Sequence, residues 1–355
     1  MRIVCAMSGG VDSSVAAALL VEAGHEVLGL TMRLYDATRE PTGRAGTCCS
    51  PAEIDQARDA CAVLGIQHYT VDERARFEGA VIDDFVRAYA TGRTPNPCVR
   101  CNEHVKFGPL LARAQALGAA ALATGHYARS EDGGLWRAVD DSKDQSYFLF
   151  AMGLPTLAGV RFPLGTWHKD QVREKARSLG LANADAPDSQ ELCFVGGGDH
   201  AAVVEARAAA LGVDLGALAP GPIVDEAGVE IGQHAGVHRV TVGQRRGLRV
   251  AGSEPRYVLR VLPETRTVVV GDLESLQVQA LVLADFRRLA AIGEQATLRA
   301  SVQVRHRGRP VPATVELEGT AARVRFDEPV GAASPGQAAV VYDGARVLGG
   351  GWIAG

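Results

Sequence analysis

The 355-residue sequence lacks the features that mark several large classes of protein. No apolar run approaches the ~18 residues of a transmembrane helix. Residues 1–4 lead directly into a strand-like run, which leaves no room for a signal peptide. Only four of the 37 basic residues are lysine, and we attribute this excess of arginine to a GC-rich genome. We therefore expect a cytoplasmic protein without a membrane segment.

A basic excess and an even set of cysteines are also lacking. The net charge of −4 provides no overall positive field for nucleic acid. Seven cysteines are an odd number, which argues against the disulfide framework of a secreted domain and leaves thiol or metal chemistry open. A composition of 47% hydrophobic and 22% charged residues is globular and excludes disordered or fibrous chains. The length allows two or three domains.

Strand-like runs alternate with helical patterns in the N-terminal part of the sequence. Strands are predicted at residues 2–7, 26–33, 67–71 and 120–124, and helices at 13–23, 52–64 and 108–117. Such alternation predicts a parallel sheet with crossover helices, the α/β class of Rossmann-like nucleotide-binding domains. We place this domain at residues 1–204.

The pattern changes after about residue 205. Glycine and proline interrupt residues 219–228, helix signals largely stop, and short strands are predicted at 257–261 and 267–270. From about residue 278, β-rich runs alternate with turn residues, which predicts a small antiparallel β-barrel. We expect a small central domain at residues 205–277 and the barrel at 278–355.

A glycine turn follows the first predicted strand. Residues 8–14 read Ser-Gly-Gly-Val-Asp-Ser-Ser and open a helix. Glycines allow the backbone to approach an anion, and the free amides and dipole of the helix start favour negative charge. Neither Gly-Lys-Ser/Thr nor Gly-x-Gly-x-x-Gly is present. A plain structural turn would not require Ser8, Asp12, Ser13 and Ser14 together, so we predict a phosphate site.

Two further strand ends are expected at the same sheet edge. The second predicted strand ends near Met32, and the strand at 120–124 is followed by Gly125 and His126. Nucleotides bind at the carboxyl ends of parallel strands. We therefore expect Gly125 to allow close approach of an adenosine, whereas a histidine such as His126 is more often packed or capping.

Three cysteines lie in polar or proline-bounded segments. Cys98 and Cys101 form a Cys-x-x-Cys pair in residues 94–102, which we predict to be a rigid loop bounded by prolines. Cys193 follows an acidic, polar turn, where it could be exposed and reactive. Of the remaining cysteines, Cys5 and Cys61 are predicted to be core residues, and Cys48 and Cys49 are a loop feature without an assigned role.

These motifs, in this order, resemble one family, the bacterial tRNA-specific 2-thiouridylases (MnmA family) of the PP-loop ATP pyrophosphatase superfamily. The resemblance covers nearly the whole chain, including the barrel-like C-terminus. It rests on residues 8–14, 94–102, 123–127, 143–149, 188–194 and 243–248.

The resemblance implies a reaction and its residues. ATP, with Mg²⁺, adenylates the C2 oxygen of the wobble uridine at tRNA position 34, and persulfide sulfur replaces that oxygen to give 2-thiouridine, AMP and diphosphate. Cys193 would carry the persulfide, and Cys101 would attack it or the adenylated intermediate, with a transient disulfide between them. The implied ATP contacts are Ala6, Met7, Ser8, Gly9, Gly10, Val11, Asp12, Ser13, Met32 and Gly125.

Cys98 departs from many family members, which have aspartate at that position. Together with Cys101 and Cys193 it makes three thiols that could hold an iron–sulfur cluster. Alternatively, Cys98 only accepts or shuttles oxidation. We favour the persulfide route over the cluster route, and zinc is disfavoured because a fourth ligand is not evident.

An acidic protein that binds tRNA must concentrate positive charge locally. Residues 239–249 hold four arginines without an acid, and residues 299–309 hold four more with His306. A solvated strand face is the alternative interpretation of each cluster. The resemblance places Asn96, Pro97 and Cys98 on the extruded base, and further tRNA contacts at His126, Lys143, Asp144, Gln145, Arg305, His306 and Gln337.

The implied partners are the anticodon arm of tRNA and a sulfur donor, either a cysteine desulfurase or a relay protein. We expect a monomer. Two other classes compete with this interpretation: an ATP pyrophosphatase that uses ammonia as its nucleophile, and a nucleotide-binding sensor without catalysis. The cysteines at 101 and 193 argue against both.

Overall fold

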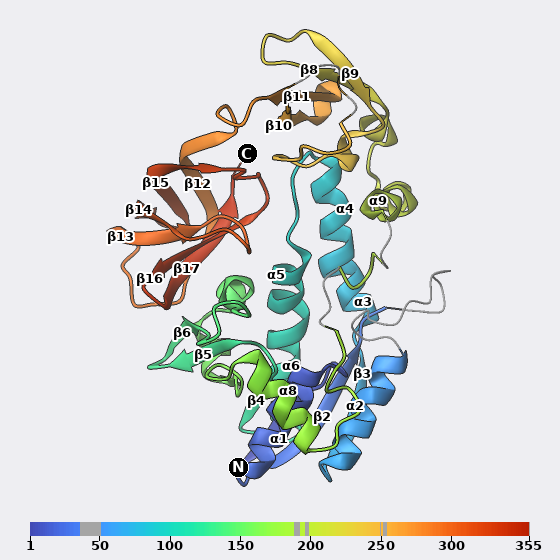
Figure 1. The fold of residues 1–355 in the computed structure, drawn as a ribbon, viewed down its shortest axis with the longest axis vertical. Coiled ribbons are helices and arrows are strands. Elements are labelled where there is room, and N and C mark those ends of the chain that lie inside the picture. Colours follow the sequence, from blue (N-terminus) through green and yellow to red (C-terminus); the bar gives the residue numbers. More distant parts are fainter. Residues whose placement is uncertain (36–50, 188–191, 196–198, 249, 251–253, 355) are drawn as a thin grey trace.

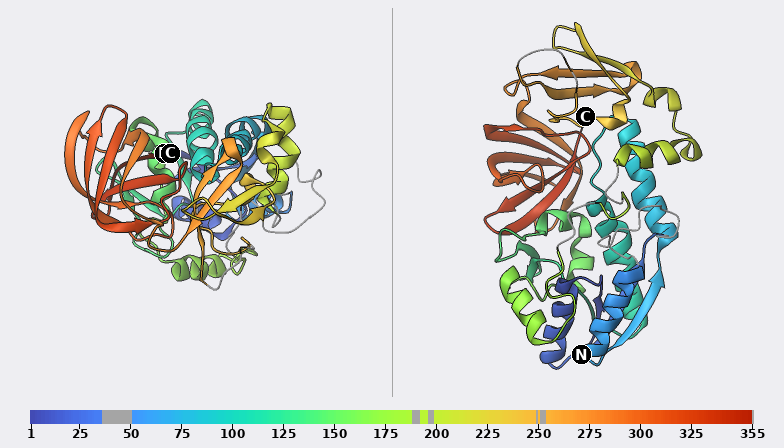
Figure 2. Two further views of the ribbon diagram at one scale, coloured as in Figure 1. Left: turned by 90° about the horizontal axis from the view of Figure 1, so that it is seen from above. Right: turned by 45° about the vertical axis from the view of Figure 1, so that its right-hand side comes forward.

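The computed structural model describes residues 1–35, 51–187, 192–195, 199–248, 250 and 254–354. A parallel sheet with its helices lies at one end, a small open sheet lies at the other, and a barrel lies along the side (Figures 1 and 2). Helix α4 runs between the two ends in both figures. None of the helices in the described ranges has the length and apolar content needed to cross a membrane.

The N-terminal sheet is parallel, in the order β3-β2-β1-β4-β7. Its strands are β1 (Arg2–Ala6), β2 (Glu26–Arg33), β3 (Gln67–Asp72), β4 (Ala121–Thr124) and β7 (Val160–Arg161), and its helices include α1 (Val11–Glu22), α2 (Pro51–Val63), α6 (Gly108–Ala116), α7 (Leu154–Ala158) and α8 (Lys169–Ser178). The central strand β1 is buried by its neighbours, with Val4 opposite Leu28 and Leu122. The predicted Rossmann-like α/β fold is confirmed.

A helical segment leaves this sheet and carries the Cys-x-x-Cys pair. It comprises α3 (Arg74–Phe77), α4 (Asp83–Ala90) and α5 (Pro97–Cys101), with π-helical turns at Glu78–Ile82 and Asn102–Phe107. The prediction of a loop at residues 94–102 is therefore wrong for residues 97–101, which form α5. Asn96 caps this helix, because its Oδ1 accepts a hydrogen bond from Val99 N at 3.3 Å. Pro97 occupies the first helical turn, where a missing N–H costs nothing.

The C-terminal half contains a mixed open sheet, in which β8 and β11 are parallel, and an antiparallel barrel. Helix α9 (His200–Ala208) precedes the open sheet, which has the order β10-β11-β8-β9 and consists of β8 (Gly221–Val224), β9 (Glu230–His234), β10 (Tyr257–Leu262) and β11 (Thr267–Gly271). The barrel strands are β12 (Gln277–Arg288), β13 (Gln295–Gln303), β14 (Val311–Glu318), β15 (Ala321–Gly331), β16 (Ala338–Asp343) and β17 (Arg346–Ile353). Pairing of β12 with β17 closes the barrel, as predicted.

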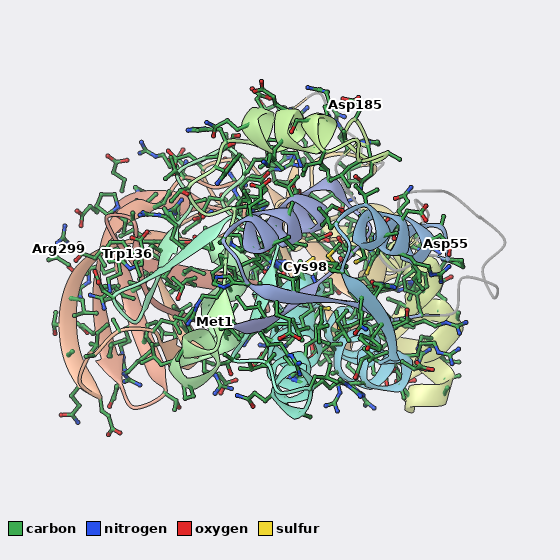
Figure 3. The ribbon with its side chains drawn as sticks, turned by 90° about the horizontal axis from the view of Figure 1, so that it is seen from below. Met1, Asp55, Cys98, Trp136, Asp185 and Arg299 are labelled. Carbon is green, nitrogen blue, oxygen red and sulfur yellow. The ribbon has the colours of Figure 1, made fainter. Side chains whose placement is uncertain are left out.

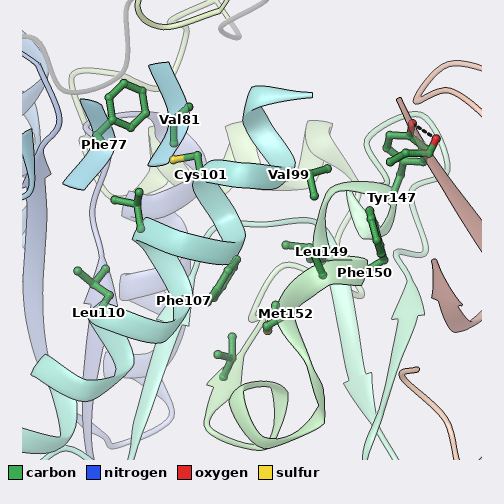
Figure 4. Close-up of a cluster of buried hydrophobic side chains, with 14 of the residues drawn as sticks. Phe77, Val81, Val99, Cys101, Phe107, Leu110, Tyr147, Leu149, Phe150 and Met152 are labelled. Carbon is green, nitrogen blue, oxygen red and sulfur yellow. Dashed lines mark hydrogen bonds between the residues drawn. The ribbon is translucent and has the colours of Figure 1, made fainter. Parts of the chain in front are cut away.

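The barrel is joined to the N-terminal domain in a way that the sequence did not indicate. The hairpin of β5 (Ala128–Glu131) and β6 (Gly134–Arg137) adds to β17, with Leu135 opposite Val347. One hydrophobic cluster continues from the helical segment into the barrel (Figure 4). Within it, Tyr147 donates a hydrogen bond to the carbonyl oxygen of Ala338 at 2.7 Å, and the rings of Phe150 and Trp352 lie 5.8 Å apart. The helical segment and the barrel therefore share a core.

Candidate active site

The Ser-Gly-Gly loop lies at the carboxyl end of β1 and leads into α1. Ser13 organises it, because its Oγ accepts a hydrogen bond from Ser8 N at 3.1 Å and donates one to the Gly10 carbonyl at 3.0 Å. Gly9 has φ of +82°, and a side chain there would collide with the carbonyl of Glu53 in α2. Ser8 and Gly10 are exposed, so the loop presents its backbone to solvent at a helix N-terminus. This geometry suits an anion.

Asp12, in the first turn of α1, is held by two side chains from distant segments. Lys169 Nζ lies 2.7 and 2.9 Å from its two carboxylate oxygens, and Tyr127 donates its hydroxyl hydrogen at 2.9 Å. The Lys169 side chain is only 8% exposed, although it carries a charge. Sequence reasoning assigned no role to Lys169 or Tyr127, because only the fold brings them to the loop. The scarcity of lysine was the one available signal.

Gly125 lies against the same helix start and has a packing role that the sequence did not indicate. A Cβ at this position would lie 2.6 Å from Ser13 N and 2.7 Å from the carbonyl carbon of Asp12. The space beside Gly125 is therefore occupied by the backbone of α1. This glycine is required for close packing between the end of β4 and the loop, and its approach to an adenosine stays a prediction.

Replacing Gly125 with alanine is expected to displace the start of α1. Forcing a methyl group against backbone atoms costs about 1–3 kcal/mol, so the thermal midpoint of unfolding should fall and the KM for ATP should rise. Gly108→Ala is the control, since a Cβ at Gly108 in α6 meets nothing within 4 Å. A Gly125→Ala protein with the midpoint and KM of the control would contradict the close packing.

His126 and Met32 lie near this edge of the sheet. Met32 is buried at the end of β2. His126 Nδ1 lies 2.8 Å from Thr124 Oγ1, and its ring is 5.5 Å from that of Phe107. Burial lowers the pKa of His126 to about 3, with a smaller contribution from the charge of Lys106, so the ring is neutral at physiological pH. The packing interpretation of His126 accounts for these contacts, and its contact with substrate stays a prediction.

The two cysteines that the resemblance pairs meet at one hydrophobic cluster. Cys101 is 7% exposed and belongs to that cluster, where its side chain lies beside Phe77 and Val81 (Figure 4). Cys193 is half-buried and packs against the same cluster. The next residue, Phe194, sets its ring 5.9 Å from Phe77. The structure therefore brings the segments of Cys101 and Cys193 to one place.

The remaining cysteines differ in exposure. Cys98, one helical turn before Cys101, is exposed. Cys5 and Cys61 are buried, as predicted, and burial raises the pKa of both thiols, that of Cys61 to about 11. They therefore remain protonated and unreactive. Cys48, Cys49 and the acidic turn at 188–191 lie outside the described residues. Across the described ranges, Cys, His, Asp and Glu side chains form no group of three that could hold a metal ion.

A second polar network joins the segment after β6 to the barrel. Arg137 lies 3.4 Å from an Asp144 carboxylate oxygen and donates to Gln303 Oε1 at 2.7 Å. Gln303 in turn donates to the carbonyl oxygens of Arg305 and His306, and the His306 ring lies 4.3 Å from Phe148. The structure thus brings together Asp144, Arg305 and His306, three of the predicted tRNA contacts.

Other predicted tRNA contacts perform structural roles as well. Asn96 is 8% exposed and caps α5, and Pro97 is buried in the first turn. Gln337 donates to the Pro95 carbonyl at 3.0 Å, which ties the barrel to the start of α5. Gln145 Oε1 accepts from Tyr127 N at 3.0 Å, and Lys143 is half-buried. Contact of these residues with tRNA stays a prediction.

Comparison with known proteins identifies the family. Three family models match: the tRNA methyl transferase HUP domain over residues 1–197, the tRNA methyl transferase PRC-barrel domain over 213–272, and the aminomethyltransferase beta-barrel domain over 278–353. A tRNA-specific 2-thiouridylase MnmA from Geobacter metallireducens is 50% identical, over 99% of this chain and 96% of its own. This chain belongs to the tRNA-specific 2-thiouridylase family.

Relatives named as thiouridylases in other bacteria cover the same length. Those of Acidothermus cellulolyticus and Chloroflexus aggregans are 48% and 47% identical, over 100% and 99% of this chain and 98% of each relative. Among solved structures, a 4-thiouridine synthetase–RNA complex with bound ATP matches over 60% of this chain and 51% of that one, at 18% identity and a TM-score of 0.36. The family match is therefore full-length.

Only some arginines of the two predicted clusters are available to bind the phosphates of tRNA, because acidic side chains neutralise several others. Arg239 forms ion pairs of 2.6 Å with Asp199 and Glu205, and Arg299 and Arg309 pair with Asp327 and Glu328 on the barrel. Arg299 lies at the outer edge of the barrel, far from Cys98 (Figure 3). Arg245, Arg246 and Arg305 are exposed and form no ion pair within the described residues. Arg249 lies outside those residues.

Replacing Arg245 and Arg246 together with alanine is expected to weaken tRNA binding by this thiouridylase. Each unpaired guanidinium that contacts a phosphate contributes about one unit to the slope of log K against log salt. The measurement is tRNA affinity at several salt concentrations. Arg299→Ala is the control, because Arg299 is already neutralised by Asp327 at 2.7 Å. Equal slopes for the two variants would contradict a phosphate role for Arg245 and Arg246.

Proposed function

We propose that this member of the family is an ATP-dependent tRNA-uridine 2-sulfurtransferase that acts on the wobble uridine. The observation that carries the proposal is the arrangement of two chemical centres on one fold. A pyrophosphate-type loop opens α1, and two thiols from distant segments of the chain, Cys101 and Cys193, pack in one hydrophobic cluster. The first centre activates an oxygen, and the second supplies sulfur.

Activation precedes sulfur transfer. The C2 oxygen of uridine is a poor leaving group until it is bonded to phosphorus. In the proposed step this oxygen attacks the α-phosphorus of ATP, an O–P bond forms, and diphosphate leaves with the electrons of the broken P–O bond. The amides of residues 8–10 and the N-terminus of α1 would bind the departing phosphates. Lys169, paired with Asp12, places its ammonium group at the same end of α1.

Sulfur then arrives as a nucleophile. The terminal sulfur of a persulfide on Cys193 attacks C2, and AMP leaves with the original oxygen. The Cys101 thiolate attacks Sγ of Cys193, so that the S–S bond to the product breaks and 2-thiouridine is released with a Cys101–Cys193 disulfide. The two cysteines thereby supply the two electrons that reduce the transferred sulfur. An external thiol must reduce the disulfide before the next turnover.

The residues fit Mg²⁺ better than an iron–sulfur cluster. Asp12 offers a hard oxygen donor, 33% exposed, beside the loop, and it would hold the ion that shields the phosphates of ATP. For an iron–sulfur cluster, Cys98 is exposed while Cys101 is buried, and within the described residues the three thiols do not form a group that could hold a metal ion. We therefore route no step through a cluster.

The proposed partners follow from the chemistry. The exposed arginines and the network around Asp144 and His306 would bind the anticodon arm, with the target base extruded toward α5. A cysteine desulfurase or a relay protein would load the persulfide on Cys193. The protein would act as a monomer in the cytoplasm.

Anaerobic purification tests the proposal. Iron and acid-labile sulfide are measured beside thiouridine formation from ATP, tRNA and a persulfide donor. Iron-free protein is expected to make 2-thiouridine, AMP and diphosphate in equal amounts. Activity that appears only in protein carrying iron and sulfide would make Cys98, Cys101 and Cys193 cluster ligands and would overturn the persulfide mechanism. Absence of ATP-dependent thiolation under both conditions would overturn the proposed function.

A further inference from the structure

A buried side chain outside all of the motifs above lies beneath the pyrophosphate loop. Asn183 belongs to the turn that follows α8 and is 6% exposed. Its Nδ2 donates to the carbonyl oxygen of Gly9 at 2.6 Å and to Ser14 Oγ at 3.2 Å. Ser14 Oγ donates in turn to the Gly10 carbonyl at 3.1 Å. One amide group therefore holds both glycines of the loop, directly or through Ser14.

This contact determines the direction of the next backbone N–H. The peptide between Gly9 and Gly10 is trans, so its C=O and N–H point in opposite directions. Because the Gly9 carbonyl points inward to Asn183, the Gly10 N–H is directed to the exposed side of the loop. That N–H makes only a long contact of 3.4 Å with Ser8 Oγ. It is thus available to an anion at the start of α1.

The loop is confined on its other side as well. The Cα of Gly9 faces the carbonyl of Glu53 in α2 so closely that no side chain fits between them. The Asn183 Oδ1 atom is buried and accepts no hydrogen bond from the described residues. The side chain is therefore linked to the loop through its Nδ2 group, which donates to Gly9 and Ser14. An aspartate of the same shape would set a carboxylate oxygen against the Gly9 carbonyl.

We propose that Asn183 is a positioning residue for ATP, which keeps the Gly10 N–H aimed at the phosphates that leave during adenylation. This inference rests on the proposed function. It assigns the residue to binding of the nucleotide and not to binding of tRNA, because within the described residues its side chain donates to Gly9 and Ser14.

Three variants test the role of Asn183 by steady-state kinetics of thiouridine formation. At pH 8, Asn183→Asp is expected to raise the KM for ATP tenfold or more, with the KM for tRNA unchanged. Burial raises the pKa of a carboxyl group, and the protonated form can donate to Gly9. The ratio of this KM to the wild-type KM should therefore fall toward one at pH 6. Asn183→Leu should raise the KM for ATP at both pH values. Asp185→Asn, an exposed change in the same turn, is the control.

The outcomes separate the two proposals. A wild-type protein without ATP-dependent thiolation refutes the proposed function, whatever the variants do. If the wild type is active and both Asn183 variants keep its KM for ATP, the positioning role is refuted. It is also refuted if ATP and tRNA KM values rise together with a lower thermal midpoint of unfolding, because that result marks a purely structural residue. The Asn183→Leu protein keeps the test decisive if Asn183→Asp fails to fold.

Discussion

Cys193→Ser is expected to abolish 2-thiouridine formation while ATP binding stays at its wild-type level. A serine hydroxyl cannot carry a persulfide, so the sulfur that replaces the C2 oxygen has no carrier. The side chain lies outside the pyrophosphate loop and packs against the hydrophobic cluster of the helical segment, so the loop should be unaffected. The measurements are thiouridine per tRNA by mass spectrometry and ATP affinity by calorimetry.

Matched cysteine variants give this prediction its controls. Cys101→Ser should also stop turnover but accumulate a disulfide-linked adduct between Cys193 and the tRNA, because nothing then attacks Sγ of that residue to release 2-thiouridine. Cys98→Ser should keep most activity in the persulfide mechanism and lose all of it in the cluster mechanism. Cys61→Ala, which removes a buried thiol whose pKa is raised to about 11, should remain active. Thiolation by the Cys193→Ser protein would contradict the assignment of the sulfur carrier.

The Cys193→Ser variant also separates the competing functional classes. An ATP pyrophosphatase that uses ammonia would not depend on Cys193, and a nucleotide sensor would have no turnover to lose. Convergence of the Cys101 and Cys193 segments on one cluster favours the sulfurtransferase. Neither competing class needs that convergence.

Local patterns predicted most of the fold. The strand predicted at residues 26–33 has those bounds in β2, and the helix predicted at 108–117 differs from α6 (Gly108–Ala116) by one residue. Such elements are visible in sequence because periodicity and helix boundaries depend on neighbouring residues. The helix at Pro97–Cys101 was missed, since two prolines within three positions suggest a loop unless Asn96 is recognised as a cap.

The active site was predictable only in part, because its contacts join distant segments. The loop motif identified Ser8–Ser13 from local sequence, but Lys169 and Asn183 reach it through the fold. The sequence also did not show that Gly125 packs against backbone atoms of α1, where a Cβ would collide. Likewise, arginine clusters were visible in sequence, whereas the acids that neutralise Arg239 and Arg299 lie on other elements.

Lys169→Met is expected to lower kcat/KM for ATP by on the order of 100-fold, which corresponds to about 2.7 kcal/mol. Removing one partner of a largely buried pair leaves an uncompensated charge. Here the Asp12 carboxylate would face the phosphates of ATP without the ammonium group that lies 2.7 Å away. ATP-dependent thiolation at saturating tRNA measures the effect. Lys175→Met is the control. Lys175 lies in α8, like Lys169, and pairs with Glu22 of α1 at 2.6 Å, but its side chain is more exposed than that of Lys169. Surface pairs of that kind contribute about 0–1 kcal/mol.

A double variant distinguishes a functional pair from a structural one. Asp12→Asn with Lys169→Met removes both charges, so no buried charge remains uncompensated and the thermal midpoint of unfolding should recover relative to Lys169→Met alone. Thiolation should stay low, because the loop has lost both the positive group beside the departing diphosphate and the carboxylate proposed to hold Mg²⁺. Recovery of both stability and thiolation would mean that Lys169 only neutralises Asp12. Recovery of stability alone places the Lys169–Asp12 pair in the reaction, because a protein that folds normally without the two charges then fails to cleave ATP.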